Sequence, residues 1–310
     1  MKFLVIGAGG TGGCIGSFLA LSGQEVTLIA RGAHLKHIKQ NGLKLKSGLK
    51  GEVLLTNINA CEDKEYFDKA DVIFICVKSY SLDEIMPIIK KSAKEGTLVI
   101  PILNGIGMGD KIADKLDREL KGVYIADGCV YIVGYVAAPG EIVQSGNIFK
   151  VVFGERKNHP IPMDKLEKIS KALCSSGIKS IISKDIESDT FLKFSFVSAL
   201  ASCGAYFNIA AGEMQKEGKY RDIFVKLTEE IKSIANAKNI LIDTDILTTN
   251  LKILDAMLPE STASLQKDLL AGKQTETDGL IFEVIRMAKK YNVAVDNYRR
   301  IADSFGHVEN

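Results

Sequence analysis

A run of small residues that could hold a phosphate group lies near the amino terminus, Gly7-Ala8-Gly9-Gly10-Thr11-Gly12. The run lies between an apolar segment, residues 3–6, and a helix-like stretch, residues 13–21, and a second apolar segment, residues 25–30, follows. A strand, a helix and a strand within about 30 residues form the unit that a dinucleotide-binding GxGxxG pattern requires. Glycine lets the backbone approach a pyrophosphate, whose charge meets the free N–H groups of the helix. A purely structural glycine turn is the alternative. We therefore predict dinucleotide binding by Gly7, Gly9, Gly10, Thr11 and Gly12.

Arg31 follows the second apolar segment, and no acidic residue stands beside it. An Asp or Glu at this point would bond the ribose 2′-hydroxyl of NAD, whereas an arginine attracts the 2′-phosphate of NADP. His34 and Lys36 come shortly after. The sequence therefore predicts NADP(H) as the cofactor, with a solvated surface arginine as the alternative interpretation.

Two further loops follow later apolar segments, and they contain Lys78 and Asn104. Ligands of open α/β sheets bind outside the carboxyl ends of the strands. A lysine there can meet a phosphate or carboxylate, and an asparagine can orient a carbonyl. An edge lysine and an ordinary Asn-Gly turn are the alternatives. We expect both residues to contact the cofactor, and Asn104 also the substrate.

The elements that must position these residues have two textures. Short apolar runs alternate with helical stretches up to about residue 183, and this pattern is typical of a parallel sheet flanked by helices. Turn signals at Pro139-Gly140 and at residues 145–147 predict a hairpin at the end of the sheet. Beyond residue 183 the apolar residues recur at helical spacing. We predict an α/β protein with a Rossmann-type NADP-binding domain, 1–183, and a mostly α-helical substrate and dimerisation domain, 184–310. The strands are expected at residues 3–6, 25–30, 53–55, 72–77, 98–103, 123–126, 141–144 and 149–154.

The composition of the 310-residue chain is that of a folded protein, with 46% hydrophobic and 25% charged residues. A net charge of +2 gives no electrostatic reason to expect a nucleic-acid or membrane partner. The six cysteines include no CxxC pair, so no metal site is expected. The first apolar run is too short for a signal peptide. We therefore expect a soluble, cytoplasmic protein.

The chain resembles the ketopantoate reductase (2-dehydropantoate 2-reductase) family over nearly its whole length. The resemblance rests on the glycine pattern, Arg31, Val77-Lys78, Asn104-Gly105, the hairpin sequence Pro139-Gly140-Glu141-Ile142-Val143, Lys193, Ser264-Leu265-Gln266-Lys267-Asp268 and Gly272-Lys273-Gln274-Thr275-Glu276. Each motif alone is weak, but their joint order and spacing are specific.

The resemblance implies a reaction in which NADPH reduces a 2-oxo acid to a 2-hydroxy acid, with 2-dehydropantoate of pantothenate and CoA biosynthesis as the expected substrate. It makes Lys193 the group that gives a proton to the developing alkoxide, and Glu276 the acid that holds the cofactor or orients the lysine. Asn104 and Ser264 match groups that touch cofactor or substrate. A homodimer is compatible with the resemblance.

The sequence departs from the family pattern after the lysine. Asparagines usually stand four and eight residues on, where this chain has Val197 and Ala201. A third family asparagine aligns with Ala211, although Asn208 is near. On one helix, Lys193, Val197 and Ala201 share a face, and we expect that face to look toward Asn104 in a substrate cleft. Val197 and Ala201 would favour an aliphatic tail over a substrate hydroxyl, unless Asn208 or Ser198 replaces the missing contacts.

Three functions remain open at this point. The first is ketopantoate reduction, and the second is reduction of a different, less polar 2-oxo acid by the same groups. The third is a non-catalytic NADP-binding sensor, against which the presence of both Lys193 and Glu276 counts.

Overall fold

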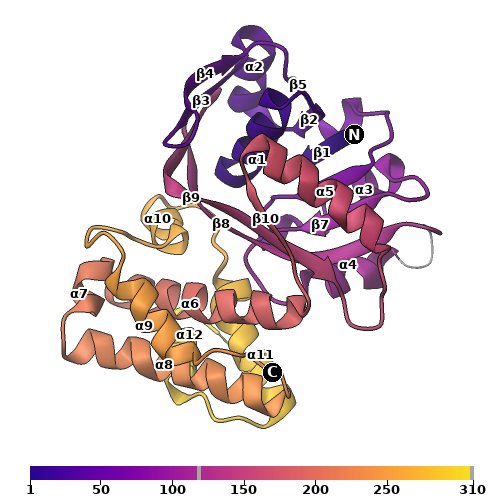
Figure 1. Ribbon diagram of the computed structural model, residues 1–310. Coiled ribbons are helices and arrows are strands. Elements are labelled where there is room, and N and C mark those ends of the chain that lie inside the picture. The colour runs from indigo at the N-terminus through magenta and orange to yellow at the C-terminus, as the bar shows by residue number, and fades with distance from the viewer. Residues whose placement is uncertain (117–119, 308–310) are drawn as a thin grey trace. The chain divides into compact units, whose positions relative to one another are not determined.

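The computed structural model describes residues 1–116 and 120–307 of the chain, and these form two compact units (Figure 1). The first unit comprises Met1–Leu103 and Gly107–Glu187, and the second comprises Asn104–Ile106 and Ser188–Asn310. The loop after the strand that ends at Pro101 thus packs with the second unit, although the strand itself belongs to the first.

A ten-stranded, mostly parallel sheet forms the frame of the first unit, with the order β4-β3-β9-β8-β7-β6-β1-β2-β5, and β10 pairs with β9. The antiparallel pairs are β3 with β4 and β8 with β9. The strands are β1 (Lys2–Ile6), β2 (Glu25–Ile29), β3 (Leu43–Ser47), β4 (Gly51–Leu55), β5 (Asn59–Cys61), β6 (Val72–Ile75), β7 (Leu98–Pro101), β8 (Tyr124–Ala138), β9 (Glu141–Glu155) and β10 (Lys179–Ile182).

Helices bury both faces of this sheet. On β1, Phe3 and Val5 join the core cluster of α1 and α5, whereas Leu4 and Ile6 join the cluster of α3 and α4. Successive side chains of a strand point to opposite faces, so a strand covered on both sides is apolar throughout. The helical elements of this unit are α1 (Gly10–Leu21), α2 (Gly32–Asn41), η1 (Asp63–Glu65), η2 (Ser79–Ser81), α3 (Met86–Ser92), α4 (Met108–Leu116) and α5 (Met163–Ser176).

The hairpin of the sheet is longer than the sequence predicts. Its turn lies at Pro139-Gly140 as expected, and Gly140 has a φ of +75°, but β8 continues to Ala138 rather than ending at residue 126. The expected strands at 141–144 and 149–154 are one strand, β9. Residues 145–147 do not form a turn. They lie at a register irregularity, where Ile132 pairs with Phe149 and Val133 with Ser145, so the Gly-Asn signal marks a bulge.

The sequence does not predict three of the strands, β3, β5 and β10. In β3, Leu43 and Leu45 are fully buried, whereas Lys44 and Lys46 are half-buried. This alternation has the period of two that is typical of a strand, but the two lysines make the segment look polar in the sequence. β5 and β10 have only three and four residues. Such short strands depend on their neighbours in the sheet rather than on their own pattern.

The second unit is helical in its described part, as the sequence predicts. The apolar residues that recur at helical spacing along α8, Ile223, Leu227, Ile231 and Ile234, are buried in one core. The elements of this unit are α6 (Ile186–Phe207), α7 (Ala211–Gln215), α8 (Lys219–Ala237), α9 (Ile246–Asp255), α10 (Ser264–Leu270), the π-helix η3 (Asp278–Phe282), α11 (Glu283–Tyr291) and α12 (Asp296–Ser304), of which α6 begins two residues before the unit does.

α6 contributes buried residues to that core. Phe191, Phe194, Ala199 and Cys203 on it are buried. Among the described residues α6 alone is long and apolar enough to cross a membrane, but 61% of its apolar window is buried inside the protein. A buried core helix meets the same criterion, so this is only a weak indication of a membrane span.

Candidate active site

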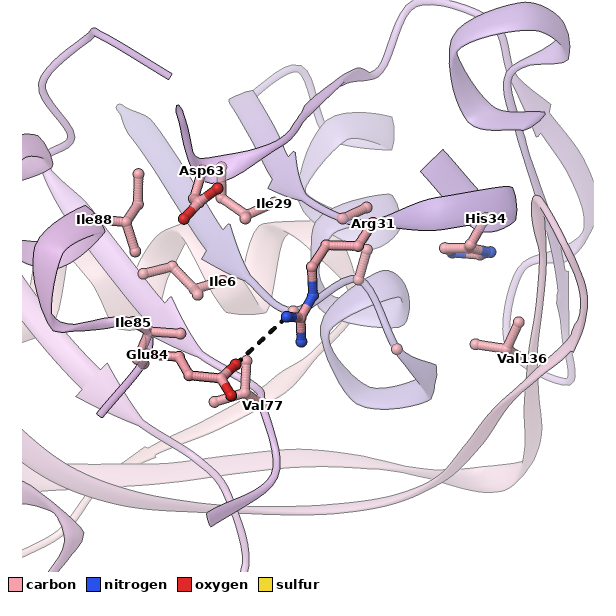
Figure 2. A pocket seen from close by; sticks show the side chains of 14 residues that line it. Ile6, Ile29, Arg31, His34, Asp63, Val77, Glu84, Ile85, Ile88 and Val136 are labelled. Carbon is pink, nitrogen blue, oxygen red and sulfur yellow. Dashed lines mark hydrogen bonds and ion pairs between the residues drawn. The ribbon is translucent and has the colours of Figure 1, made fainter. Parts of the chain in front are cut away.

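A cavity of about 340 Å³ opens in the first unit beside the carboxyl ends of β1, β2 and β6 (Figure 2). Gly7, Ala8 and Gly9 line it from the β1–α1 loop, and Ala30 and Arg31 line it from the end of β2. This is the place where open α/β sheets bind their ligands. The volume is at the lower end of the range for small-molecule pockets and suits part of a dinucleotide.

The glycines of the loop have separate structural reasons. Gly7 has a φ of +99°, a conformation that favours glycine, and its N–H donates to the carbonyl oxygen of Ile29 at 3.1 Å. Gly9 has open space where a side chain would be, and it precedes the first turn of α1, which contains no acidic residue. An anion approaching Gly9 would therefore meet bare backbone and the positive end of a helix.

Gly10 and Gly12 are required by packing. A β-carbon on Gly10 would lie 2.2 Å from the carbonyl oxygen of Gly134 on β8, and one on Gly12 would lie 2.0 Å from the carbonyl oxygen of Gly7. Both distances are far below van der Waals contact. Thr11 lies between them and is half-buried. Gly10 and Gly12 thus let α1 approach its neighbours, whereas Gly7 and Gly9 shape the pocket.

Arg31 precedes α2 with an extended backbone, and its side chain reaches into the pocket, where 74% of it is exposed. Its Nη1 lies 3.4 Å from Oε2 of Glu84 (Figure 2). Asp63 also lines the pocket. The end of β2 itself carries no acid, as the sequence shows, but the fold brings two carboxylates to the pocket from segments farther along the chain.

His34 connects the pocket to the hairpin. Its Nδ1 accepts a hydrogen bond from the N–H of Gly140 at 3.0 Å, and the imidazole lines the cavity. Burial lowers the pKa of His34 and so favours the neutral ring. Lys36 is exposed and does not belong to the pocket lining, and Lys78 is half-buried at the start of η2, beside Val77, which does line it.

In the second unit, Lys193 and Asn104 meet directly. Lys193 is half-buried on α6, and its Nζ donates a hydrogen bond to Oδ1 of Asn104 at 2.9 Å. Asn104 lies 89 residues before Lys193 in the chain. Ile106, two residues after Asn104, is buried in the core of the second unit. The sequence predicts both as site residues, and the structure places them in contact.

The residues one and two turns beyond Lys193 differ in exposure. Val197 is half-buried, whereas Ala201 is 1% exposed and packed within the core. Ser198 is fully buried, and its hydroxyl bonds the carbonyl oxygen of Leu280 and the hydroxyl of Tyr298, both at 2.6 Å. Its bonds to protein leave Ser198 unable to replace a missing asparagine.

Glu276 and Ser264 lie in other segments of the second unit. Glu276 is 3% exposed just before η3, and its carbonyl oxygen accepts from the N–H of Leu280. Ser264 is the exposed first residue of α10. Asn208 ends α6 in the left-handed conformation, and its Oδ1 accepts from Nε2 of Gln266 at 3.1 Å.

Models of known protein families match both parts of the chain. The family model described as ketopantoate reductase PanE/ApbA matches residues 3–158, and the model of its C-terminal part matches residues 185–309. The chain belongs to the ketopantoate reductase PanE/ApbA family. It is therefore an oxidoreductase with a Rossmann-like domain and a helical C-terminal domain.

Relatives of this ketopantoate reductase family member cover it almost end to end. An uncharacterized oxidoreductase of Bacillus subtilis, YkpB, is 28% identical over 298 residues, which are 95% of this chain and 94% of that protein. A 2-dehydropantoate 2-reductase of Pyrococcus horikoshii is 26% identical and covers 94% of this chain and 92% of its own. The ternary structure of D-mandelate dehydrogenase with NADH and anilino(oxo)acetate superposes with a TM-score of 0.87 at 23% identity, covering 98% and 96% of the two chains. That likeness shows the shared fold.

The sequence does not predict that Glu84 and Asp63 line the pocket. Both belong to segments that follow other strands, so only the folded sheet brings them to Arg31 and its pocket. The one available signal was that loops after neighbouring parallel strands meet at one edge of a sheet. The Ser198–Tyr298 contact had no signal, because its partners are 100 residues apart.

Proposed function

We propose that this chain reduces a 2-oxo acid to a 2-hydroxy acid with NADPH, and that the substrate is 2-dehydropantoate, as in pantothenate and CoA biosynthesis. The observation that carries the proposal is the 2.9 Å hydrogen bond between Lys193 and Asn104. Family membership and the name of the Pyrococcus horikoshii relative support the choice of substrate.

Lys193 has the geometry of a proton donor. NADPH, when bound, supplies the hydride that adds to the ketone carbon, and the ketone oxygen then needs one proton to become a hydroxyl. The ammonium of Lys193 has three N–H bonds. Asn104 accepts one of them and so fixes the direction of the others, one of which gives its proton to that oxygen and leaves a neutral amine.

Glu276 and Ser264 complete the proposed set of groups. The burial of Glu276 suits a carboxylate that holds the cofactor or orients Lys193, and Ser264 offers an exposed hydroxyl for the substrate. Val197 contributes an apolar surface one turn from Lys193. Ala201 has almost no exposed surface to contribute.

The choice of NADP rests on the first unit. Gly7, Gly9 and the amino-terminal end of α1 would hold the diphosphate, and Arg31 would hold the 2′-phosphate, with Lys78 toward the nicotinamide. Open space at Gly9 and the pocket beside Arg31 suit such a ligand.

A second candidate is the reduction of a less polar 2-oxo acid, which Val197 favours. The family asparagine at that place would bond a hydroxyl of ketopantoate, and valine cannot. An aliphatic 2-oxo acid loses nothing by this replacement.

A panel of 2-oxo acids, followed by the loss of NADPH absorbance, tests the proposal. The panel contains ketopantoate and 3,3-dimethyl-2-oxobutanoate, which has the same skeleton without the hydroxyl. Turnover of either supports the proposal, and their ratio chooses between the two candidates. A protein that binds NADPH and reduces no 2-oxo acid would instead be a sensor. Light scattering of the same sample tests the expected homodimer.

A further inference from the structure

The nucleotide pocket contains an acidic residue opposite the arginine that is proposed to recognise NADP. Glu84 lies in the turn before α3, lines the pocket, and pairs with Arg31 at 3.4 Å (Figure 2). Apolar residues, Val77 and Ile85, line the pocket beside Glu84, and the second carboxylate, Asp63, lies near Ile88 (Figure 2). Glu84 is the carboxylate that pairs with Arg31, so it faces whatever Arg31 binds.

We propose that Glu84 is a specificity-determining residue that narrows the preference for NADPH over NADH by competing with the 2′-phosphate for Arg31. This inference rests on the proposed function, since it concerns the same coenzyme. In the absence of coenzyme the carboxylate neutralises the guanidinium. A 2′-phosphate must displace the carboxylate of Glu84 from Arg31 and then remain beside the negative charge of that carboxylate. A 2′-hydroxyl, in contrast, can donate a hydrogen bond to the carboxylate.

The exposure of the pair sets the size of this effect. The side chains of Arg31 and Glu84 are 74% and 62% exposed, so their attraction is weak enough to be displaced by a ligand. A 2′-phosphate carries close to two negative charges, and its repulsion by one screened carboxylate a few ångströms away corresponds to about a three- to tenfold change in affinity.

The second carboxylate of the pocket, Asp63, is placed differently. Its Oδ1 accepts a hydrogen bond from the N–H of Lys64 at 2.8 Å, and in Figure 2 it lies near Ile29 and Ile88. The competition is therefore assigned to Glu84. Its neighbour Asp83 pairs with Lys115 and does not belong to the pocket lining, so it offers the same charge change at a matched position.

Calorimetric titration of the full chain tests the proposal without relying on turnover. The ligands are two matched pairs that differ by the 2′-phosphate alone: NADPH with NADH, and adenosine 2′,5′-bisphosphate with AMP. The proteins are wild type, Glu84→Gln, Glu84→Ala and the control Asp83→Asn. Thermal unfolding establishes that each variant is folded.

The expected result is that both Glu84 variants tighten NADPH and the bisphosphate by about three- to tenfold, while AMP and NADH stay within about twofold or weaken. Asp83→Asn should change none of these affinities by more than about twofold. An unaltered ratio within the pairs, or an equal shift in Asp83→Asn, overturns the inference and leaves the proposed function standing. If the wild-type protein binds neither NADPH nor NADH, the proposed function fails and the inference with it.

Discussion

The ammonium of Lys193 donates a hydrogen bond to Oδ1 of Asn104 across 89 residues of sequence, at a distance of 2.9 Å. Asn104 comes from the loop after β7, and Lys193 from the second turn of α6. The contact restricts the ammonium to one position within the second unit. Ordering a long, flexible side chain before the substrate binds reduces the conformational entropy that binding must remove.

Lys193→Ala should lower turnover by about 10²- to 10⁴-fold, because the variant has lost its general acid. The affinity for NADPH should change little, since the group acts on the substrate oxygen. Steady-state kinetics and calorimetry measure the two effects separately. Lys184→Ala, which removes an exposed lysine just before α6, is the control. A variant that keeps most of the wild-type rate on its best substrate would show that Lys193 is not the proton donor.

Arg31→Ala should weaken NADPH by roughly 1.5–3 kcal/mol, the usual value of a hydrogen bond to a charged group, and should weaken NADH much less. Lys36→Ala is the matched control, because Lys36 is an exposed cation on α2, the helix that Arg31 precedes, and it does not belong to the pocket lining. Dissociation constants for both coenzymes measure the difference. An equal loss for NADPH and NADH, or a wild-type preference for NADH, contradicts the assignment of Arg31 to the 2′-phosphate.

Stability should depend on pH through Asp127 of β8. Burial raises the pKa of this carboxyl from 3.8 to about 6. The hydrogen bond that the carboxyl accepts from the N–H of Gly109 lowers the pKa and so opposes the effect of burial. Between these two values the folded state holds the proton more often than the unfolded state, so stability falls as pH rises from about 4 to about 6. The fall amounts to at most about 3 kcal/mol.

Asp127→Asn removes the titrating group and should remove this part of the slope. Urea unfolding of wild type and variant across that range measures it, and the difference between the two curves cancels the contributions of all other groups. A difference that does not vary with pH would mean that Asp127 does not titrate in this window.

The sequence was sufficient for those parts of the fold that depend on local pattern. β1, α1 and β2 follow from an apolar run, a glycine pattern and a second run, and the buried face of α8 follows from its spacing. The pairing of Asn104 with Lys193 could be expected only through the family resemblance. The spacing of residues along the chain says nothing about a contact between residues so far apart.

The parts that could not be predicted depend on tertiary packing. Gly10 fits the dinucleotide pattern, yet its small size is required by the close approach of Gly134 from a strand over 100 residues away. The sequence does not predict that Glu84 lies beside Arg31, because the two residues follow different strands of the sheet. Ser198 looked available for a substrate until Leu280 and Tyr298 were found to bond its hydroxyl.

Val197 gives the sharpest test of substrate choice. It lies one helical turn from Lys193 and is half-buried, so part of its side chain is accessible. Val197→Asn restores the amide that family members usually carry there. We expect this variant to shift the ratio of kcat/KM for ketopantoate to that for 3,3-dimethyl-2-oxobutanoate toward ketopantoate by about three- to tenfold, the value of one hydrogen bond of roughly 0.5–1.5 kcal/mol.

The two substrates differ only by the hydroxyl, so their ratio is insensitive to a general loss of activity. Val197→Ala is the control: it alters the size of the side chain without adding a polar group, and it should leave the ratio within about twofold. An equal shift in both variants would mean that space rather than hydrogen bonding controls selectivity. If Val197→Asn leaves the ratio unchanged, Val197 does not face the substrate tail. Asn208, whose Oδ1 already accepts from Gln266, then becomes the next amide to test.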